Sequence, residues 1–324
     1  MQSRFTTPVS IPAQPFDLSY CDKLLLAGSC FAEEIGQLLL ANKFDADVNP
    51  FGVLYNPASL EASLRRLMHP EPFALPDLFL HEEMYHSFAH HSRFSSPSPD
   101  AALEAMNRQL QISSSRLKET TRLVITWGTA FVYKLKSNGQ VVSNCHKLPA
   151  GYFTREQLSV EDIASAWQSL LEEIREWNPK LKLILTVSPI RHWKEGAHGN
   201  QLSKSALLLA ADRLQQACPG LVAYFPAYEI MMDELRDYRF YAGDMLHPSP
   251  QAVDYIWERF RQSFFAPDTQ TAYDLWQPVR KALEHTPVNP GSEAHRRFIT
   301  QTLLKAEQLS KKFPFFDISN DWEI

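Results

Sequence analysis

The sequence predicts an α/β fold in which an open parallel β-sheet carries helices on both faces. First, short apolar runs typical of buried parallel strands alternate with amphipathic stretches of helical length. Second, 324 residues are enough to bury a substantial core in one main domain with an appendage. Third, the 44% hydrophobic and 21% charged residues are typical of a globular protein. Strands that alternate with helices in this order favour a doubly wound sheet.

The first part of the chain predicts two strands, each followed by a helix. Residues 24–27 form a continuous apolar run, and the apolar residues after Ser29 recur at helical spacing. A second strand over 45–48 precedes a helix that begins at Pro57 and carries leucines on one face. Residues 70–99 are rich in proline, histidine and aromatic residues without a clear period, so we expect a long, partly ordered loop insertion.

The middle of the chain predicts a helix, a central strand and a hairpin. The helix covers about 100–118, and 123–126 is the clearest central strand. Asn138-Gly139 lies between the β-favouring runs 131–135 and 141–143, which is a strong hairpin signal.

The rest of the chain continues the alternation. We predict a helix that begins after a capping Ser159 and runs to Trp177, strands over 181–187 and 221–225, and helices near 203–217, 228–235 and 250–264. Two further helices and a tail follow. The predicted organisation is an α/β domain over 1–264, with the insertion at about 70–99, and a helical C-terminal extension over 265–324.

The charge balance excludes several classes of partner. The formal net charge is −5 and the pI is about 6.1, so we expect neither nucleic acid nor an anionic membrane surface as a partner. We find neither an apolar signal-peptide segment nor an apolar run long enough to cross a membrane. The four cysteines are scattered without a C-x-x-C motif, so we expect reduced thiols and a cytoplasmic protein.

Small or polar residues follow several predicted strands. Ser29, Gly52, Gly128 and Ser188 each lie just after a strand. Ligands of open α/β sheets bind beyond the carboxyl ends of the strands, so these residues are expected to gather at one edge.

Three residues have the chemistry of a serine hydrolase. Ser29 follows Gly28 at a strand-to-helix turn, while Asp244 and His247 lie three positions apart near the end of the core. A serine nucleophile needs a histidine to accept its proton and a carboxylate to orient that histidine. The plainer alternatives are that Ser29 only caps a helix, and that the late pair is a solvated turn.

Cys30 is a competing nucleophile beside the serine. Adjacent side chains of a helix point about 100° apart, so only one of the two can face the histidine. The residue directly after the turn glycine is Ser29, which favours the serine.

An oxyanion hole requires preorganised donors. The candidates are the Ser29 and Gly52 backbone N–H groups and the Asn144 side-chain amide, and His146 is a candidate polar contact. Gly52, Asn144 and His146 are equally explained as turn residues.

Two further residues, Arg191 and His192, are candidates to line the pocket and set substrate preference, although a solvated loop explains them as well. We do not expect a metal site at the histidines of the insertion, because they lack helical or hairpin spacing and cysteine partners. These histidines are His81, His86, His90 and His91.

The motifs resemble the GSCFA family, whose name spells residues 28–32. The resemblance covers roughly residues 20–262 and includes 49–52, 144–147, 188–189, 238–241 and 244–248. That family is related to the SGNH, or GDSL-like, esterases and lipases. The resemblance implies a flavodoxin-like three-layer α/β/α fold with a nucleophilic Ser29. It also implies that Asp244 and His247 complete a triad and that Gly52 is an oxyanion donor.

One departure from the SGNH pattern concerns the oxyanion hole. A Gly-x-Asn is expected after a central strand, but the chain has Gly128-Thr129-Ala130. Either Asn144 replaces the missing amide or the hole has two donors. Losing one donor typically costs about 10²–10³ in rate.

The sequence therefore predicts a serine esterase that hydrolyses a small acyl ester without a cofactor or metal. Fold analogy alone suggests an O-acetylated carbohydrate as its substrate. Two alternatives remain open, a binding module that keeps the pocket without the chemistry, and an acyltransferase that uses the same residues.

Overall fold

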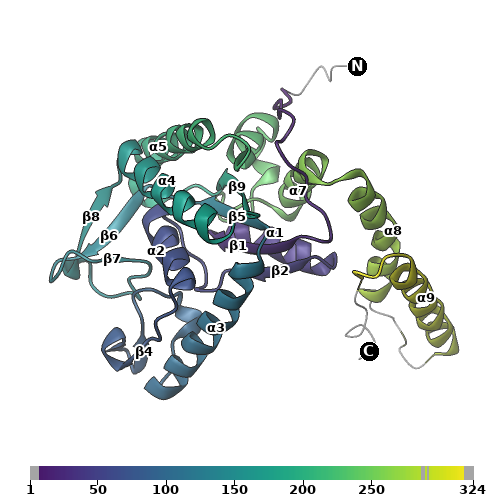
Figure 1. Cartoon of the computed structure of the whole chain (residues 1–324), viewed down its shortest axis with the longest axis horizontal. Helices are drawn as coiled ribbons and strands as arrows, with labels where there is room; N and C mark the ends of the chain where they lie inside the picture. Colours follow the sequence, from purple (N-terminus) through teal and green to yellow (C-terminus); the bar gives the residue numbers. More distant parts are fainter. Residues whose placement is uncertain (1–6, 286–288, 290–291, 317–324) are drawn as a thin grey trace.

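The computed structural model describes residues 7–285, 289 and 292–316. A parallel sheet in the strand order β10-β9-β5-β1-β2 forms its centre (Figure 1). The strands are β1 (Lys23–Gly28), β2 (Asp45–Val48), β5 (Arg122–Trp127), β9 (Lys182–Val187) and β10 (Val222–Phe225). The chain winds outward from β1 in both directions, as in flavodoxin-like sheets. The predicted fold class is confirmed.

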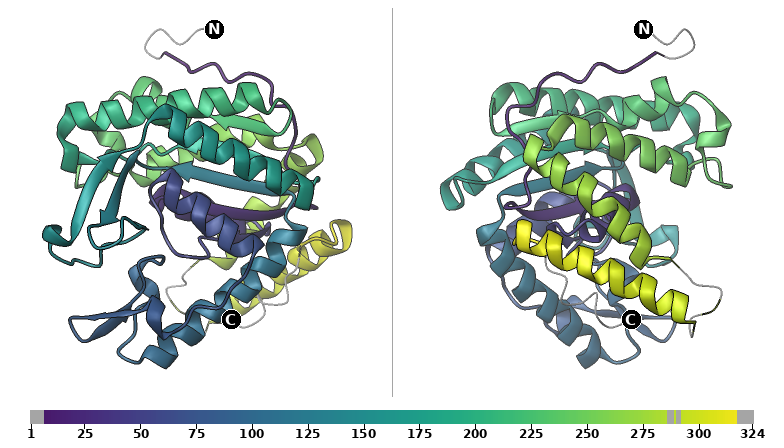
Figure 2. Two further views of the ribbon diagram at one scale, coloured as in Figure 1. Left: turned by 60° about the vertical axis from the view of Figure 1, so that its left-hand side comes forward. Right: turned by 90° about the vertical axis from the view of Figure 1, so that its right-hand side faces the viewer.

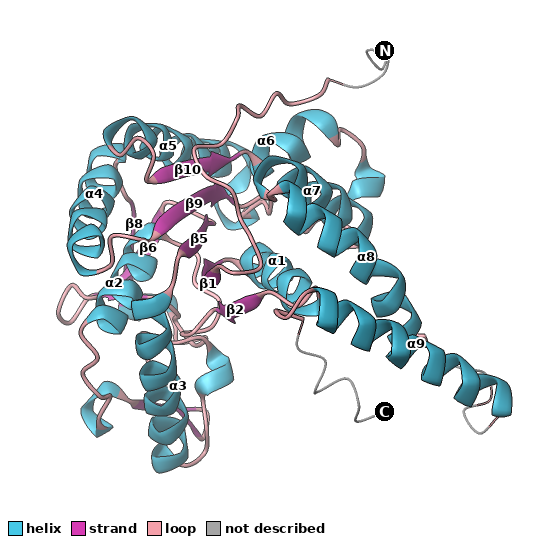
Figure 3. Ribbon diagram, turned by 45° about the vertical axis from the view of Figure 1, so that its right-hand side comes forward, coloured by secondary structure: helices cyan, strands magenta, loops and turns pink. Residues whose placement is uncertain are grey.

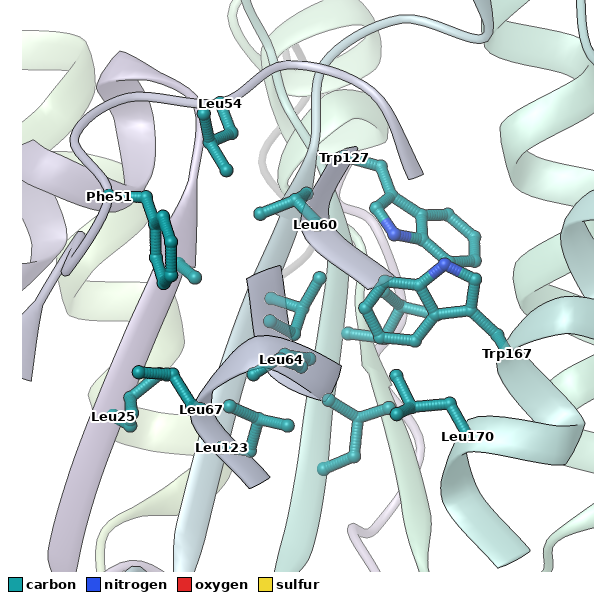
Figure 4. Close-up of a cluster of buried hydrophobic side chains, with 14 of the residues drawn as sticks. Leu25, Phe51, Leu54, Leu60, Leu64, Leu67, Leu123, Trp127, Trp167 and Leu170 are labelled. Carbon is teal, nitrogen blue, oxygen red and sulfur yellow. The ribbon is translucent and has the colours of Figure 1, made fainter. Parts of the chain in front are cut away.

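Alternate residues of each strand point to opposite faces, which explains why the buried residues of β1, β5 and β9 are mostly apolar. Leu24 and Leu26 of β1 belong to a core cluster on one face, and Leu25 belongs to a second cluster on the other face. Figure 4 shows the second cluster, in which the Trp127 and Trp167 rings meet edge to face with centroids 5.2 Å apart. Both faces are therefore sealed from water, and only the edges of the sheet are open for chemistry.

Helices cover both faces of the sheet (Figure 3). On the face of Leu24 lie α1 (Cys30–Ala41), α6 (Ala227–Glu229) and α7 (Pro250–Phe264). On the other face lie α2 (Pro57–Met68), α3 (Pro99–Glu119), α4 (Val160–Trp177) and α5 (Gly196–Ala217). Among the helices that the structure describes, none is both long enough and apolar enough for a bilayer.

The start of α5 differs from the sequence prediction. The helix begins at Gly196, whereas the prediction places its start near residue 203. Gly196 and Gly199 have low helix propensity, so the first turns carry no helical signal. The capping residue of α4 is as predicted, because the Ser159 side chain accepts a hydrogen bond from the Asp162 N–H.

A smaller antiparallel sheet contains the predicted hairpin. Its strands lie in the order β7-β6-β8 and comprise β6 (Phe131–Leu135), β7 (Val141–Val142) and β8 (Phe153–Gln157). The sequence analysis does not predict β8. Its residues are mostly exposed and include Arg155 and Glu156, so they show no apolar alternation.

The insertion at 70–99 is more ordered than predicted. It contains an antiparallel hairpin of β3 (Phe79–His81) and β4 (Met84–His86). The turn between them places Glu82 and Glu83 at positive φ, 46° and 61°. Glycine, asparagine or aspartate normally marks such a turn, so the sequence gives no sign of the hairpin.

The two helices predicted after residue 264 are α8 (Pro267–Leu283) and α9 (Glu293–Lys312), which lie side by side in Figure 2. They are attached to the main domain. The Trp276 indole N–H of α8 donates to the Ala41 carbonyl at 3.2 Å, and the buried Phe316 ring lies 5.1 Å from the Tyr20 ring. The parts of the predicted domains at 1–6, 286–288, 290–291 and 317–324 lie outside the described residues.

This packing predicts that the C-terminal segment contributes to global stability. Replacement of the fully buried Phe316 by alanine should lower the free energy of unfolding by about 3–5 kcal/mol, because it removes a large buried ring. Phe298→Ala is the matched control, because that ring is 39% exposed, and it should cost much less. Denaturant unfolding measures both values, and equal losses in the two variants would contradict the packing.

Candidate active site

A cavity of about 590 Å³ opens at the carboxyl ends of the sheet strands. Ser29 after β1 and Thr129 after β5 line it, so it lies where the winding of the sheet changes direction. Five of the predicted site residues line this one cavity, namely Ser29, Asn144, Arg191, His192 and His247. Of the four residues predicted to gather at this edge, Ser29 lines the cavity, whereas Gly52, Gly128 and Ser188 are not among its lining residues.

Gly28 allows the turn that presents Ser29. Its φ is +151°, and a Cβ at this position would lie 2.4 Å from the Thr126 carbonyl oxygen of the neighbouring strand. Only glycine fits such a close approach of two backbones. The chain can therefore leave β1 tightly against β5 and enter α1 within one residue.

The side chain of Asn49 holds this turn in place. Its Oδ1 accepts a hydrogen bond from the Gly28 N–H at 2.9 Å, and its Nδ2 donates to Glu33 of α1 at 2.6 Å. The Gly28 carbonyl accepts from the Leu54 N–H at 2.9 Å. These hydrogen bonds join the segments that follow β1 and β2.

Ser29 is at the N-cap of α1, but its side chain does not cap the helix. The residue is 1% exposed, and its Oγ has no hydrogen-bond partner among the described residues. An unpaired buried hydroxyl costs free energy, so a purely structural serine would normally be satisfied. The helix-cap alternative for Ser29 therefore does not describe this geometry.

The side chains of His247 and Asp244 are hydrogen-bonded to each other. The Nδ1 of His247 lies 2.5 Å from the Asp244 Oδ2. The other carboxylate oxygen accepts the backbone N–H groups of Leu246 and His247 at 2.9 and 3.0 Å. Hydrogen bonds from His247 and Leu246 lower the pKa of Asp244 to about 2, so its carboxylate is ionised at neutral pH. The pairing at Nδ1 leaves Nε2 free to face a nucleophile.

Other groups in the cavity are weaker candidates for these roles. Burial lowers the pKa of His192 to about 3, with Lys204 adding to the effect, so this imidazole is a poor base at neutral pH. Burial raises the pKa of Cys30, a free thiol whose Sγ lies 3.8 Å from the Tyr55 hydroxyl. A thiol without a lowered pKa is poorly activated, which favours Ser29 over Cys30.

The structure does not bring Gly52 into the cavity. Its N–H donates to the Asn49 carbonyl at 2.7 Å within a turn, and Gly52 is not a lining residue. A Cβ here would lie 2.2 Å from the His91 Cβ, so this glycine is needed for close packing against the insertion. The expected role of Gly52 as an oxyanion donor therefore needs correction.

Two asparagine amides remain as donors at the cavity. Asn144 lines it, and its Oδ1 accepts from the His146 N–H at 2.9 Å, which leaves its NH₂ group available. Asn56 also lines it, and its Oδ1 caps α2 by accepting from the Ser59 N–H at 2.8 Å. The sequence analysis does not identify Asn56, because the residue has the pattern of an ordinary helix cap.

His146 is also outside the cavity, contrary to expectation. Its Nε2 bonds the Ser87 carbonyl at 2.8 Å, and its ring lies 4.5 Å from the His86 ring. His90 packs against the Phe51 ring at 4.9 Å. Within residues 7–285, 289 and 292–316, no group of three or more His, Cys, Asp or Glu side chains is arranged to hold a metal ion. These histidines have packing and hydrogen-bonding partners instead.

The outer wall of the cavity comes from the small sheet and the β9–α5 loop. Tyr133 and Arg155 of the sheet line it together with Arg191, Lys194 and Glu195 of the loop. Arg155 forms an ion pair with Glu195. Of this wall, Arg191 is among the predicted site residues, whereas Arg155 is missed because β8 is not predicted.

Buried Lys204 anchors the base of the β9–α5 loop at the cavity. Its ammonium donates to the carbonyls of Gly128 and Ser188, both at 2.7 Å. It therefore ties the ends of β5 and β9 to α5.

Comparison with known proteins supports a specific family. The sequence model of the GSCFA family matches residues 23–260, and a model described as GSCFA domain protein, C-terminal domain, matches 276–324. No curated protein shows significant similarity to the chain. Among solved structures, the chain is similar to an acetyl xylan esterase (Est2A) from the rumen bacterium Butyrivibrio proteoclasticus, with 13% identity and a TM-score of 0.38. The match covers 76% of this chain and 65% of that one.

The buried histidines predict a loss of stability in acid. Burial lowers the pKa of His90 to about 3 and of His146 to about 4, whereas an unfolded histidine titrates near 6.5. Between these values the unfolded chain binds more protons, so stability falls as the pH falls below about 6.5. Each such histidine contributes a slope of about 1.4 kcal/mol per pH unit.

Denaturant unfolding from pH 7 to pH 5 measures this slope. His90→Phe should reduce it, because the ring is surrounded by phenylalanines and phenylalanine does not titrate. The exposed His198→Phe is the control and should leave the slope unchanged. An unchanged slope in His90→Phe would show that this histidine does not titrate as described.

Proposed function

Because the chain belongs to the GSCFA family, we propose that it is a serine esterase that hydrolyses small acyl esters with Ser29, His247 and Asp244. One observation carries the proposal. The buried, unpartnered Ser29 hydroxyl and the carboxylate-oriented His247 line the same cavity. A nucleophile, a base and an orienting acid are the three parts that acyl transfer to serine requires.

In the proposed reaction, Ser29 Oγ attacks the ester carbonyl carbon and His247 Nε2 takes the serine proton. The carboxylate of Asp244 stabilises the resulting imidazolium. His247 then gives the proton to the departing alcohol, which leaves an acyl group on Ser29. Water attacks this acyl-enzyme with His247 again as base, and the acid is released.

Ser29 and His247 do not hydrogen-bond to each other, since Ser29 Oγ has no partner among the described residues. Such bonds often tighten only when substrate binds. His247 lies on a loop that is closed by a backbone hydrogen bond. The His247 carbonyl accepts this bond from the Ala242 N–H at 2.8 Å. We infer that a movement of this loop completes the proposed triad.

The proposed oxyanion hole combines one backbone donor with side-chain amides. The Ser29 N–H makes only a long bond to the Thr126 carbonyl, 3.3 Å, and is the backbone candidate. The amide of Asn144 would replace the Gly-x-Asn asparagine that the chain lacks, and Asn56 offers a second amide. Donors of this kind stabilise the tetrahedral intermediates.

A fluorophosphonate probe tests the nucleophile. Ser29 should be phosphonylated, and labelling should disappear in Ser29→Ala and fall strongly in His247→Ala, since the base activates the hydroxyl. Peptide mass mapping identifies the site. Ser137→Ala and His198→Ala, both at exposed positions, are the matched controls and should label normally. Absence of labelling in the folded wild-type protein would favour a non-catalytic binding module.

The oxyanion assignment predicts a separate effect on turnover. Asn144→Ala should lower kcat on a para-nitrophenyl ester by about 10²–10³-fold, because it removes one donor from the transition state. Asn138→Ala, in the exposed hairpin turn, is the control. Steady-state kinetics measure both variants. If Asn144→Ala retains the wild-type kcat, Asn144 is not an oxyanion donor.

A further inference from the structure

The cavity has an excess of positive charge that the proposed reaction does not use. Its lining contains three basic side chains, Arg155, Arg191 and Lys194, against one carboxylate, Glu195. The chain as a whole carries a net charge of −5. The ion pair between Arg155 and Glu195 neutralises one of the cations. Two cations therefore remain without a counter-charge in the wall of an acidic protein.

Arg191 has aromatic and cationic neighbours instead of an acid. Its guanidinium lies over the Trp193 ring, 5.3 Å from the centroid, and its buried Nε has no hydrogen-bond partner among the described residues. It lies near enough to Lys204 to help burial lower the pKa of that ammonium to about 7. No described carboxylate lies within ion-pair distance of Arg191, so its charge is left for a ligand.

Lys194 occupies the same loop three residues further along. Its ammonium bonds the Tyr133 hydroxyl at 2.5 Å and lies 4.9 Å from the centre of that ring. It likewise forms no ion pair with a described residue. Phenol and indole rings thus contact both cations at the cavity wall, and neither cation forms an ion pair with a described residue.

We propose that the substrate of this site carries an anionic group, and that Arg191, with Lys194 beside it, binds that group. A guanidinium presents parallel N–H donors that match a carboxylate or a phosphate. A cavity walled by cations also attracts anions electrostatically. This proposal specifies the substrate class of the esterase proposed above and rests on that function for its kinetic test.

The kinetic test compares two esters of similar chain length, para-nitrophenyl butyrate and the mono-para-nitrophenyl ester of glutarate. The wild-type protein should have the higher kcat/KM for the anionic glutarate ester. Arg191→Met should lower the ratio of the two kcat/KM values by about tenfold, because it removes the partner of the carboxylate. Arg191→Lys should keep part of the preference, and added salt should reduce it.

The matched control is Arg213→Met, an exposed residue of α5 outside the cavity that pairs with Glu161, and it should keep the wild-type ratio. Hydrolysis of both esters with no anionic preference, or with a preference that Arg191→Met leaves intact, would overturn the proposal. The esterase assignment would survive that result.

A binding test separates the two proposals if neither ester is hydrolysed. Free glutarate should raise the Tm of the wild-type protein, because it binds only the folded state. The shift should be lost in Arg191→Met and retained in Arg213→Met. A glutarate-dependent shift without hydrolysis would support the anion site and contradict the esterase. No shift in any of the three proteins would overturn the anion site.

Discussion

The site depends on the close approach of β1 and β5 at Gly28. Because Gly28 has no side chain, its backbone can lie against the Thr126 carbonyl, where a Cβ would be 2.4 Å away. Ser29, the next residue, therefore leaves the sheet as the first residue of a turn. It is buried, and its hydroxyl has no hydrogen-bond partner among the described residues. The side chain of Asn49 then holds the turn by accepting a hydrogen bond from the Gly28 N–H. A serine presented in this way lies on rigid backbone at the point where ligands of such sheets bind.

The rest of the site is built on loops and is less constrained. Asp244 and His247 lie in a surface loop, with side chains 47% and 43% exposed, and their geometry is set by hydrogen bonds within that loop. The unpaired cations of the cavity wall, Arg191 and Lys194, belong to the β9–α5 loop. Lys204 anchors the base of this loop because its ammonium donates to the Gly128 and Ser188 carbonyls. A proposed nucleophile at a strand end that faces side chains carried by loops fits the common division of roles in α/β folds.

The sequence predicts the central sheet well because its strands and helices have strong apolar periods. It also predicts that residues following the parallel strands gather at one edge, and Ser29 lines the cavity there. Prediction from the sequence fails where the residues show no local pattern. The charged residues of β8 show no apolar alternation, so the strand that carries Arg155 of the cavity wall is not predicted. The Gly52 N–H donates to the Asn49 carbonyl, a hydrogen bond that no sequence pattern reveals. Arg191 is already a candidate from the sequence, but its lack of an acidic partner among the described residues, and Lys194 beside it in the cavity wall, are seen only in three dimensions.

The most direct measurement of the central claim is a crystal structure of the protein with a small alkylboronic acid, which forms a tetrahedral adduct with an activated serine. The account predicts boron bonded to Ser29 Oγ. It also predicts one boronate oxygen near the amide of Asn144 or Asn56, and His247 Nε2 within hydrogen-bonding distance of the adduct. Boron bound at another residue, or an adduct that His247 does not reach, would contradict the proposed triad.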